Sequence, residues 1–278
     1  MRTDAPIGVF DSGIGGLTVV SEMLKLMPEE RIIYFGDTAR APYGSRSAEE
    51  IKEFMFQILA FFSAQQVKMA VMACNTMTAL GLKLAQEAMA FPVVGVNTGI
   101  HAALQASTNH QIGVIATEAT IASGNHARTL QSLEHAAVLY PQACPKFVPL
   151  IEAGELISPR TEAAAQEYLL PLQKAKVDSL ILGCTHYPFI GSLLRQIMGP
   201  NVTLIDPAKE TAADAYAILA QQGMLAKTGS GSRQLCFSAD LKRAQRMAGH
   251  VMDLETVQFT KIDLQDFVGY HREEDCVG

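Results

Sequence analysis

The sequence predicts an α/β fold made of two pseudo-symmetric domains with mainly parallel sheets, and three observations support this prediction. Short apolar runs rich in Val and Ile alternate with longer segments of helical periodicity. Several of these runs are apolar throughout, which is typical of strands buried on both faces of a parallel sheet. A segment that contains Cys74 also recurs, at a constant offset, around Cys184.

The elements follow one another as strand and helix along most of the chain. The second helix is the best marked, because Ser47 and Glu50 form a capping-box pattern at its start. The strands are expected at residues 7–11, 31–37, 69–74, 92–96, 112–117, 135–141, 179–184 and 202–206. The helices are expected at residues 16–27, 47–66, 76–90, 119–132, 160–175 and 187–198, with further helix after 208.

The internal repeat is the most informative feature. VKMAVMACNT (67–76) resembles VDSLILGCTH (177–186), and each copy places a cysteine at the end of a strand, before a turn and a helix. Ligands of open α/β sheets bind at the carboxyl ends of strands, so two facing units would point both cysteines into one cleft. The domains are expected to comprise residues 1–97 with 208–278, and residues 98–207.

Composition excludes several classes of function. The net charge of −6 and the lack of a Lys/Arg cluster disfavour nucleic acid as the primary ligand. The N-terminus does not resemble a signal peptide, and no apolar run approaches the ~20 residues that span a bilayer, so we expect a cytoplasmic protein without membrane contact. The five scattered cysteines show neither a disulfide framework nor zinc-ligand spacing, so no structural metal is expected.

Paired cysteines suit a racemase, which removes a proton from one face of an α-carbon and returns one to the other face. One residue begins as the base and the other as the acid, so two equivalent groups on two related domains fit the task. Because both Cys74 and Cys184 precede a predicted helix, we expect the helix dipole to lower their pKa and favour the thiolate. Asp11, at the end of the first predicted strand, and His186, two positions after Cys184, are the polar residues expected to orient or assist them.

A carbanion at the α-carbon needs stabilisation. No pyridoxal-phosphate signature is recognisable, although a lone lysine such as Lys68 or Lys209 stays an open alternative. Without a cofactor, hydrogen-bond donors and water exclusion must stabilise the charge. The donors expected near the cysteines are Ser12, Asn75, Thr76, Thr117, Thr120 and Thr185.

Other polar residues receive a structural interpretation. Asp37 is expected to be a turn or capping residue, and the GIGG glycines (13–16) are expected to permit a tight turn and close approach to a ligand rather than to bind a nucleotide. The cysteines expected to be core or incidental thiols are Cys144, Cys236 and Cys276. The histidines expected at the surface are His101, His110, His126, His135 and His250.

Over nearly its whole length the sequence resembles the glutamate racemases of the aspartate/glutamate racemase superfamily. The motifs that carry the resemblance are FDSGIGGLTV (10–19), YFGDTARAPYG (34–44), ACNT (73–76), ATEATIASG (116–124), FVPLIEAG (147–154) and GCTHYP (183–188). The resemblance implies cofactor-independent interconversion of L-glutamate and D-glutamate, with D-glutamate supplied to bacterial peptidoglycan synthesis. It also implies a homodimer.

The resemblance further assigns roles to individual residues. Cys74 matches the base that deprotonates D-glutamate, and Cys184 matches the base that deprotonates L-glutamate. Asp11, Glu152 and His186 match auxiliary catalytic residues. The residues expected to bind substrate are Asp11, Ser12, Pro42, Tyr43, Gly44, Asn75, Thr76, Thr117, Thr120, Thr185 and His186.

Three other functions remain open on the sequence alone. An aspartate racemase would share the chemistry and differ in the dimensions of its cleft. A thiol redox enzyme would require Cys74 and Cys184 to bond, with Cα atoms within ~7 Å. A non-catalytic amino-acid binder would bind its ligand without exchanging the α-hydrogen with solvent.

Overall fold

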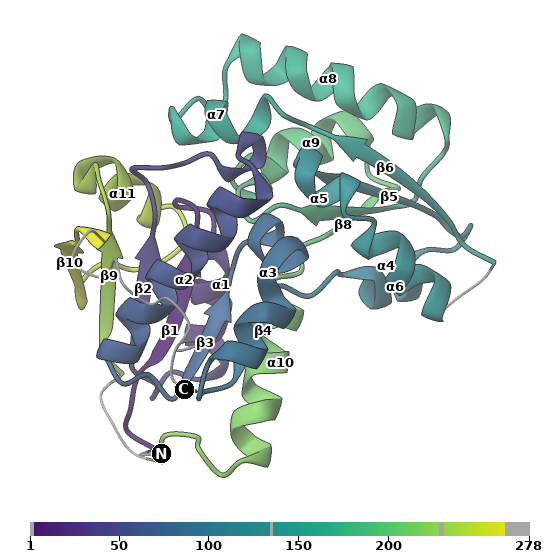
Figure 1. The fold of residues 1–278 in the computed structure, drawn as a ribbon. Coiled ribbons are helices and arrows are strands. Elements are labelled where there is room, and N and C mark those ends of the chain that lie inside the picture. Colours follow the sequence, from purple (N-terminus) through teal and green to yellow (C-terminus); the bar gives the residue numbers. More distant parts are fainter. Residues whose placement is uncertain (1–2, 134–135, 228–230, 265–278) are drawn as a thin grey trace.

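A computed structural model describes residues 3–133, 136–227 and 231–264 of the chain, which form two sheets flanked by helices (Figure 1). The strands are β1 (Ile7–Asp11), β2 (Ile32–Gly36), β3 (Met69–Met72), β4 (Val93–Gly95), β5 (Gln111–Ala116), β6 (Val138–Ala143), β7 (Ser179–Gly183), β8 (Thr203–Ile205), β9 (Arg233–Phe237) and β10 (Val257–Lys261). One sheet has the order β10-β9-β2-β1-β3-β4, and the other has the order β6-β5-β7-β8. Every strand pairing in the two sheets is parallel, which confirms the predicted fold class.

The helices follow the predicted alternation. They are α1 (Leu17–Leu26), η1 (Tyr43–Ser45), α2 (Ala48–Ala64), α3 (Asn75–Ala88), α4 (Ile100–Ala106), α5 (Glu118–Ala122), α6 (Asn125–Leu133), α7 (Phe147–Glu152), α8 (Pro159–Lys174), η2 (Tyr187–Ile190), α9 (Gly191–Met198), α10 (Ala208–Gln221) and α11 (Leu241–Ala248), where η denotes a 3₁₀ turn. The capping box at α2 is confirmed, since Ser47 Oγ accepts from Glu50 N and Glu50 Oε2 accepts from Ser47 N. No helix of the described residues is long and apolar enough to cross a membrane.

The differences from the predicted elements have local causes. The predicted helix 119–132 is divided into α5 and α6 at Gly124, whose φ of 66° lies in the left-handed region. The predicted helix 187–198 begins as the 3₁₀ turn η2. The helices α4 and α7 have seven and six residues, too few to display a helical period in the sequence.

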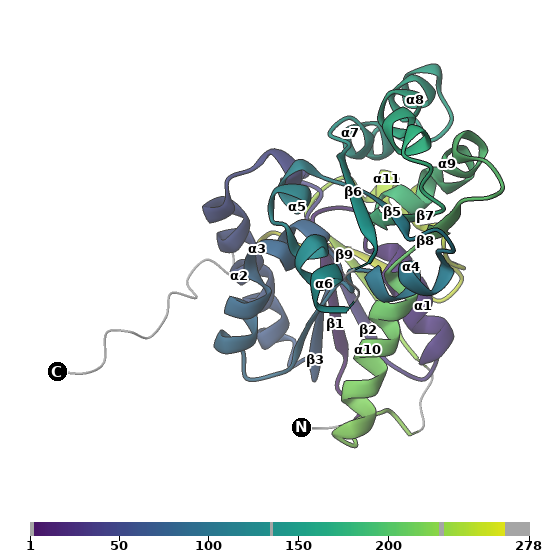
Figure 2. The same cartoon turned by 90° about the vertical axis from the view of Figure 1, so that its right-hand side faces the viewer.

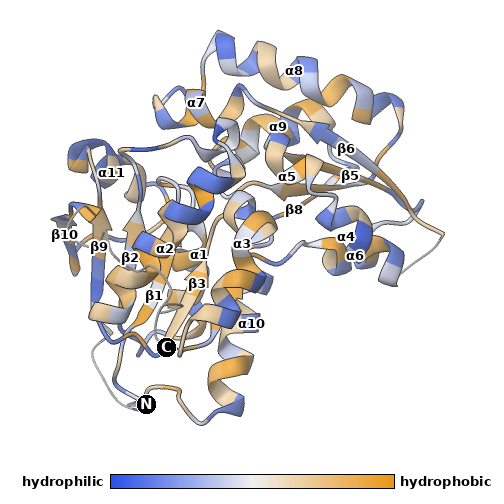
Figure 3. Cartoon of the chain, in the orientation of Figure 1, coloured by the Kyte–Doolittle hydropathy of each residue, from blue (hydrophilic) through white to orange (hydrophobic). Residues whose placement is uncertain are grey.

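Helices cover both faces of each sheet (Figures 1 and 2). In the six-stranded sheet, α2 and α3 pack together on one face, and α1 and α10 pack together on the other. In the four-stranded sheet, α4 and α6 cover one face, and α7, α8 and α9 cover the other. Strands β1, β2, β3 and β7 are buried along their whole length, and Figure 3 shows the apolar centre of the larger sheet. Covered faces explain why these strands are apolar throughout.

The C-terminal part of the described chain returns to the six-stranded sheet. Helix α10 packs on α1, β9 pairs with β2, and β10 pairs with β9. The domain limits expected from the sequence, residues 1–97 with 208–278 and residues 98–207, stay a prediction.

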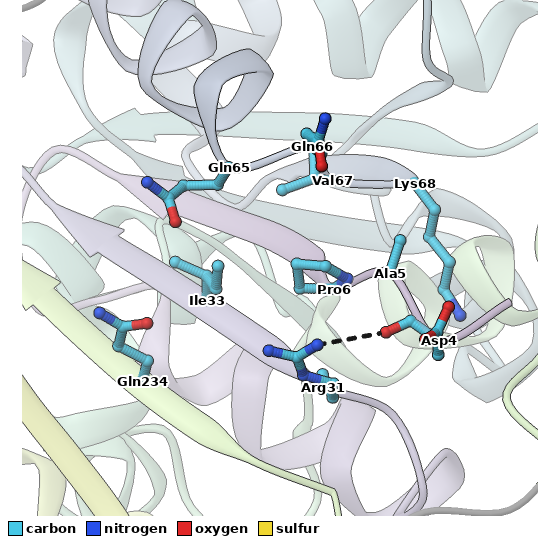
Figure 4. Close-up of a pocket in the computed structure, with 10 residues that line it drawn as sticks. All are labelled: Asp4, Ala5, Pro6, Arg31, Ile33, Gln65, Gln66, Val67, Lys68 and Gln234. Atoms are coloured by element: carbon cyan, nitrogen blue, oxygen red, sulfur yellow. Dashed lines mark hydrogen bonds between the residues drawn. The ribbon is translucent and has the colours of Figure 1, made fainter. Parts of the chain in front are cut away.

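Lys68 lies at the amino end of β3, where it is engaged in a buried cluster. Its Nζ atom donates to the carbonyls of Thr3 (2.7 Å) and Met224 (2.8 Å) and pairs with Glu30 Oε2 at 2.6 Å. The side chain is fully buried beside a cavity of about 490 Å³ at the amino ends of the strands (Figure 4). This end of the sheet is opposite to the cysteines, and the ammonium group is engaged by two carbonyls and one carboxylate, so Lys68 is not available as a cofactor lysine.

Lys68→Met is expected to lower the free energy of unfolding by about 3–5 kcal/mol, because it leaves the Glu30 carboxylate buried and unpaired. Urea denaturation measures the change, and Lys68→Met with Glu30→Gln should recover part of it. Lys83→Met is the matched control, since Lys83 is 88% exposed in a pair with Glu87, and its effect should be below about 1 kcal/mol. Equal effects of the two lysine substitutions would contradict the prediction.

His126 shows that the surface prediction for the remaining histidines is wrong at one position. His101, His110 and His250 are exposed and His135 lies outside the described residues, whereas His126 is only 5% exposed. His126 and Leu130 lie one turn apart on the buried face of α6. Because burial disfavours the imidazolium, the pKa of His126 falls from 6.5 to about 4.

His126 is therefore expected to make the protein less stable in mild acid. Between pH 6.5 and about 4 the unfolded chain binds a proton at this residue that the folded chain does not. Because of this difference in proton binding, lowering the pH from 7 to 5 should reduce the free energy of unfolding by about 2 kcal/mol. Urea unfolding of wild type, His126→Gln and the exposed control His250→Gln measures it; an undiminished pH dependence in His126→Gln would refute the assignment.

Candidate active site

One half of the candidate site lies at the carboxyl ends of β1 and β3. These strands are neighbours in the six-stranded sheet, so Asp11 at the end of β1 and Cys74 just after β3 lie close together. Cys74 is the N-cap residue of α3, and its Sγ atom donates to Ser12 Oγ across 3.9 Å. Asp11 is fully buried and accepts a hydrogen bond from Gly16 N at 2.7 Å. The turn after β1 thereby fixes a carboxylate beside the thiol.

The other half lies at the carboxyl end of β7 in the four-stranded sheet. Cys184, Thr185 and His186 follow this strand directly and are buried. His186 Nδ1 lies 3.8 Å from Cys184 Sγ, and His186 Nε2 lies 2.7 Å from Glu152 Oε1. Glu152 is the last residue of α7, so a carboxylate, an imidazole and a thiol form one connected series.

The two halves are in direct contact. Thr185 Oγ1 donates to Asp11 Oδ2 across 3.3 Å, and Ile14 N donates to Glu152 Oε1 across 3.3 Å. The two halves of the site, predicted from sequence segments more than a hundred residues apart, therefore meet at one place. Cys74 Sγ lies beside Ser12, which follows Asp11, and Cys184 Sγ lies beside His186, which follows Thr185.

Glycines in the turn after β1 allow the second unit to approach this closely. A Cβ atom on Gly15 would lie 2.5 Å from both His186 Nδ1 and Thr185 Oγ1, and one on Gly13 would overlap Glu152 Oε1. The sequence predicts a tight turn and a close approach to a ligand, and in the structure these glycines approach side chains of the other unit.

Residues 42–44 lie next to the helix α5. Tyr43 is buried, and its hydroxyl donates to the carboxylate of Asp37, which gives Asp37 the structural role expected from the sequence. A Cβ atom on Gly44 would lie 3.3 Å from the side chain of Thr117. Pro42 is half-buried immediately before η1, after a cis peptide bond.

Three threonines join the two units on this side. Thr76 Oγ1 lies 3.0 Å from Thr117 Oγ1, which itself lies 2.9 Å from Thr120 Oγ1. Thr117 is also the N-cap residue of α5. Beside them, Asn75 is buried and its Oδ1 atom has no hydrogen-bond partner among the described residues. A buried amide oxygen left in this state is available to a ligand.

Cys74 does not have the lowered pKa that its helix position predicts. Burial raises the pKa of Cys74 well above its ordinary value, and the charges of Asp11 and Cys184 add to this effect. The N–H of Met77 in the first turn of α3 acts in the predicted direction but is outweighed.

His186 and Glu152 have the charges of a buried ion pair. Burial lowers the pKa of His186, but its contacts with Cys184 and Glu152 outweigh burial and raise that pKa well above its ordinary value. Burial raises the pKa of Glu152, but His186, Arg243 and the N–H of Ile14 lower it by more. A charged His186 can donate one proton to Glu152 and the other to Cys184 Sγ.

The sequence assigned no role to two residues of this region, although Tyr34 stands at the start of the motif 34–44. Tyr34, from β2, donates its hydroxyl to the Gly13 carbonyl at 2.7 Å and supports the turn after β1. Arg243, from α11, lies 3.5 Å from Glu152 Oε2. Asp11 is buried in the same region, and burial raises the pKa of its carboxyl above the ordinary value.

Known proteins resemble the chain along most of its length. The Asp/Glu/Hydantoin racemase family matches residues 7–215. A glutamate racemase of Oceanobacillus iheyensis is 45% identical over 218 residues, which cover 78% of this chain and 80% of that protein. A crystal structure of a glutamate racemase isoform from Bacillus anthracis has a TM-score of 0.88 and 35% identity, covering 95% of this chain and 99% of that one.

A further structure, of glutamate racemase from Francisella tularensis in complex with D-glutamate, has a TM-score of 0.85 and 34% identity and covers 95% of this chain and 99% of that one. The sequence motifs, the two parallel sheets and these similarities agree. The chain therefore belongs to the Asp/Glu/hydantoin racemase family, in its glutamate racemase group.

Proposed function

We propose that this chain interconverts L-glutamate and D-glutamate without a cofactor, using Cys74 and Cys184 as the two proton-transfer groups. The observation that supports this most is that Thr185, which follows Cys184, donates a hydrogen bond to Asp11, which lies beside Cys74, so the two buried thiols of the repeats belong to one site. Each thiol also has its own polar partners, Ser12 beside Cys74 and His186 beside Cys184. A reaction that is symmetric about one carbon calls for such a pair.

With L-glutamate, Cys184 as the thiolate takes the α-proton, and Cys74 as the thiol delivers its own proton to the opposite face. One proton leaves the carbon and another arrives, so no oxidation or reduction takes place. The reaction of D-glutamate runs in reverse. The raised pKa of Cys74 keeps its thiol protonated, which is the form that the L-glutamate direction requires.

The auxiliary groups divide between the two sulfurs. His186, held by Glu152, presents a hydrogen-bond donor to Cys184 and complements its negative charge. Asp11 lies beside Cys74, where its raised pKa makes it a more basic carboxylate than usual and a suitable proton partner for that thiol.

Substrate binding rests on the polar groups around the two sulfurs. The free Oδ1 of Asn75 suits the ammonium group of glutamate, and hydroxyl and backbone donors suit its carboxylates. The loop at residues 42–44 lies against Thr117 and closes that side. The residues proposed to contact substrate are Asp11, Ser12, Pro42, Tyr43, Gly44, Asn75, Thr76, Thr117, Thr120, Thr185 and His186.

The carbanion formed between the two steps is stabilised by fixed donors in a site from which water is excluded. The burial of both cysteines, Asp11 and His186 supports this. In the cell, the product D-glutamate serves peptidoglycan synthesis, and we propose that the enzyme works in the cytoplasm as a homodimer. The D-glutamate complex of the Francisella relative supports glutamate as the substrate.

Purified protein without added pyridoxal phosphate tests this function. Circular dichroism or polarimetry should show optical activity of L-glutamate and of D-glutamate decaying to the same racemic end point. L-Aspartate in parallel separates the two racemases, and its rate should be far lower. Racemisation of aspartate at the higher rate, or no racemisation of either amino acid, would contradict the proposal.

A further inference from the structure

We propose that Arg243 is a positioning residue for the Cys184 half of the reaction, because it holds the Glu152 carboxylate in the orientation that presents His186 to Cys184. This inference rests on the proposed glutamate racemisation. Arg243 lies on α11, in the part of the chain that follows β9. Through Glu152, Arg243 connects this segment to His186, which follows strand β7 of the other sheet.

The two oxygens of Glu152 have different partners. Oε1 is bound by His186 Nε2 at 2.7 Å and by Ile14 N at 3.3 Å. Oε2 has no hydrogen-bond partner among the described residues, and Arg243 Nη2 lies 3.5 Å from it. The side chain of Glu152 is 9% exposed, so water offers this oxygen little compensation. The guanidinium is thus placed against the oxygen that His186 does not use.

The start of α11 fixes Arg243 in this place. Asp240 is the N-cap residue of α11, and its carboxylate accepts from Arg243 N at 3.2 Å. Asp240 Oδ2 also lies 3.5 Å from Arg243 Nε. Asp240 therefore binds the backbone of Arg243 by a hydrogen bond and its Nε by an ion pair, while the far end of the guanidinium faces Glu152. Arg243 is 26% exposed, so it is shielded from solvent on most of its surface.

Removal of the guanidinium takes the ion-pair partner from Glu152 Oε2 and lets the carboxylate turn away from His186. This movement weakens the contact of His186 with Cys184, because Glu152 contacts His186 and His186 contacts Cys184. Cys74 is reached by other groups, Ser12 and Asp11. Arg243 should therefore affect one of the two proton transfers more than the other.

Steady-state rates in the two directions cannot reveal this asymmetry. The equilibrium constant between enantiomers is unity, so kcat/KM for L-glutamate and D-glutamate must change by the same factor. Primary deuterium isotope effects do reveal it. Deuterium at the α-carbon of L-glutamate is transferred to Cys184, and deuterium at the α-carbon of D-glutamate is transferred to Cys74.

The experiment compares wild type, Arg243→Gln, Arg243→Lys and the control Arg246→Gln, in which an exposed arginine of the same helix loses the same charge. Arg243→Gln should lower kcat/KM about 10-fold, the lower end of the loss seen when an outer partner of a functional histidine is removed. Its isotope effect with L-[2-²H]glutamate should rise and that with D-[2-²H]glutamate should fall. Arg243→Lys should restore most of the rate, and Arg246→Gln should match wild type.

Three results would overturn the proposal. They are equal kinetics of Arg243→Gln and Arg246→Gln, a loss of rate in which the two isotope effects do not move in opposite directions, and a loss that Arg243→Lys does not reduce. A lower thermal midpoint with unchanged isotope effects would mean that Arg243 only stabilises α11. If wild type failed to racemise glutamate, the proposed function would fail, whereas an active wild type with an unaffected Arg243→Gln would overturn only this inference.

Discussion

Cys74→Ala and Cys184→Ala are each expected to reduce glutamate racemisation by roughly 10²- to 10⁴-fold, the range lost when a general acid or base is removed. Each substitution leaves one face of the α-carbon without a proton donor or acceptor. Because the other thiol is buried on the opposite unit, it cannot serve both faces. Polarimetry with L-glutamate and with D-glutamate measures the loss.

Cys236→Ala is the matched control for these two variants. Cys236 is fully buried, like the proposed catalytic cysteines, but lies within β9, and its pKa is raised to about 12 by burial. Its substitution should leave the specific activity of the folded enzyme close to that of wild type. A Cys74→Ala or Cys184→Ala enzyme that racemised at a near wild-type rate would disprove the two-base mechanism.

Gly15→Ala is expected to reduce racemisation about 10²-fold, because a displacement of about 1 Å at a catalytic group has effects of that size. The added Cβ atom would lie 2.5 Å from Thr185 Oγ1 and from His186 Nδ1. These two residues, which follow Cys184, must therefore move, and the hydrogen bond from Thr185 to Asp11 is disturbed. Gly15 does not have a positive φ, so alanine there introduces the contact without backbone strain. The rate of racemisation by purified variant checks this.

Gly191→Ala makes the same chemical change where nothing opposes it. A Cβ atom on Gly191, at the start of α9, would meet no atom within 4 Å. This control should retain activity. Full activity of Gly15→Ala would mean that the close approach between the turn after β1 and the second unit is not required for turnover.

Much of the fold could be predicted because most strands and the longer helices of this chain carry their own local pattern. Strands such as β1 and β7 are apolar at every position, and they are covered on both faces by helices. The start of α2 could be located from Ser47 and Glu50 alone, since the capping box depends only on residues three positions apart. By contrast, α4 and α7 are too short to show a period, and Gly124 divides a helix by a backbone conformation that its neighbours do not reveal.

The residues of the candidate site could be predicted where the internal repeat and the family resemblance point to them. The environment of each side chain could not be predicted, because it depends on tertiary contacts. The environment of Cys74 is one example: its place before α3 predicts a lowered pKa, but burial beside Asp11 raises it. Arg243 is another, because its contact with Glu152 joins segments that are distant in the chain. His126 is a third example, because the sequence does not show that the face of α6 with His126 and Leu130 is the buried one.

Racemisation of L-glutamate in deuterium oxide, stopped after a few per cent of conversion, tests the two-base mechanism most directly. If Cys184 takes the proton and Cys74 supplies another from the opposite side, the D-glutamate formed carries deuterium at its α-carbon, while the remaining L-glutamate carries almost none. Mass spectrometry of the separated enantiomers gives both values. D-Glutamate that retained the original protium would show that a single group moves the hydrogen between faces, and the paired-cysteine mechanism would be wrong.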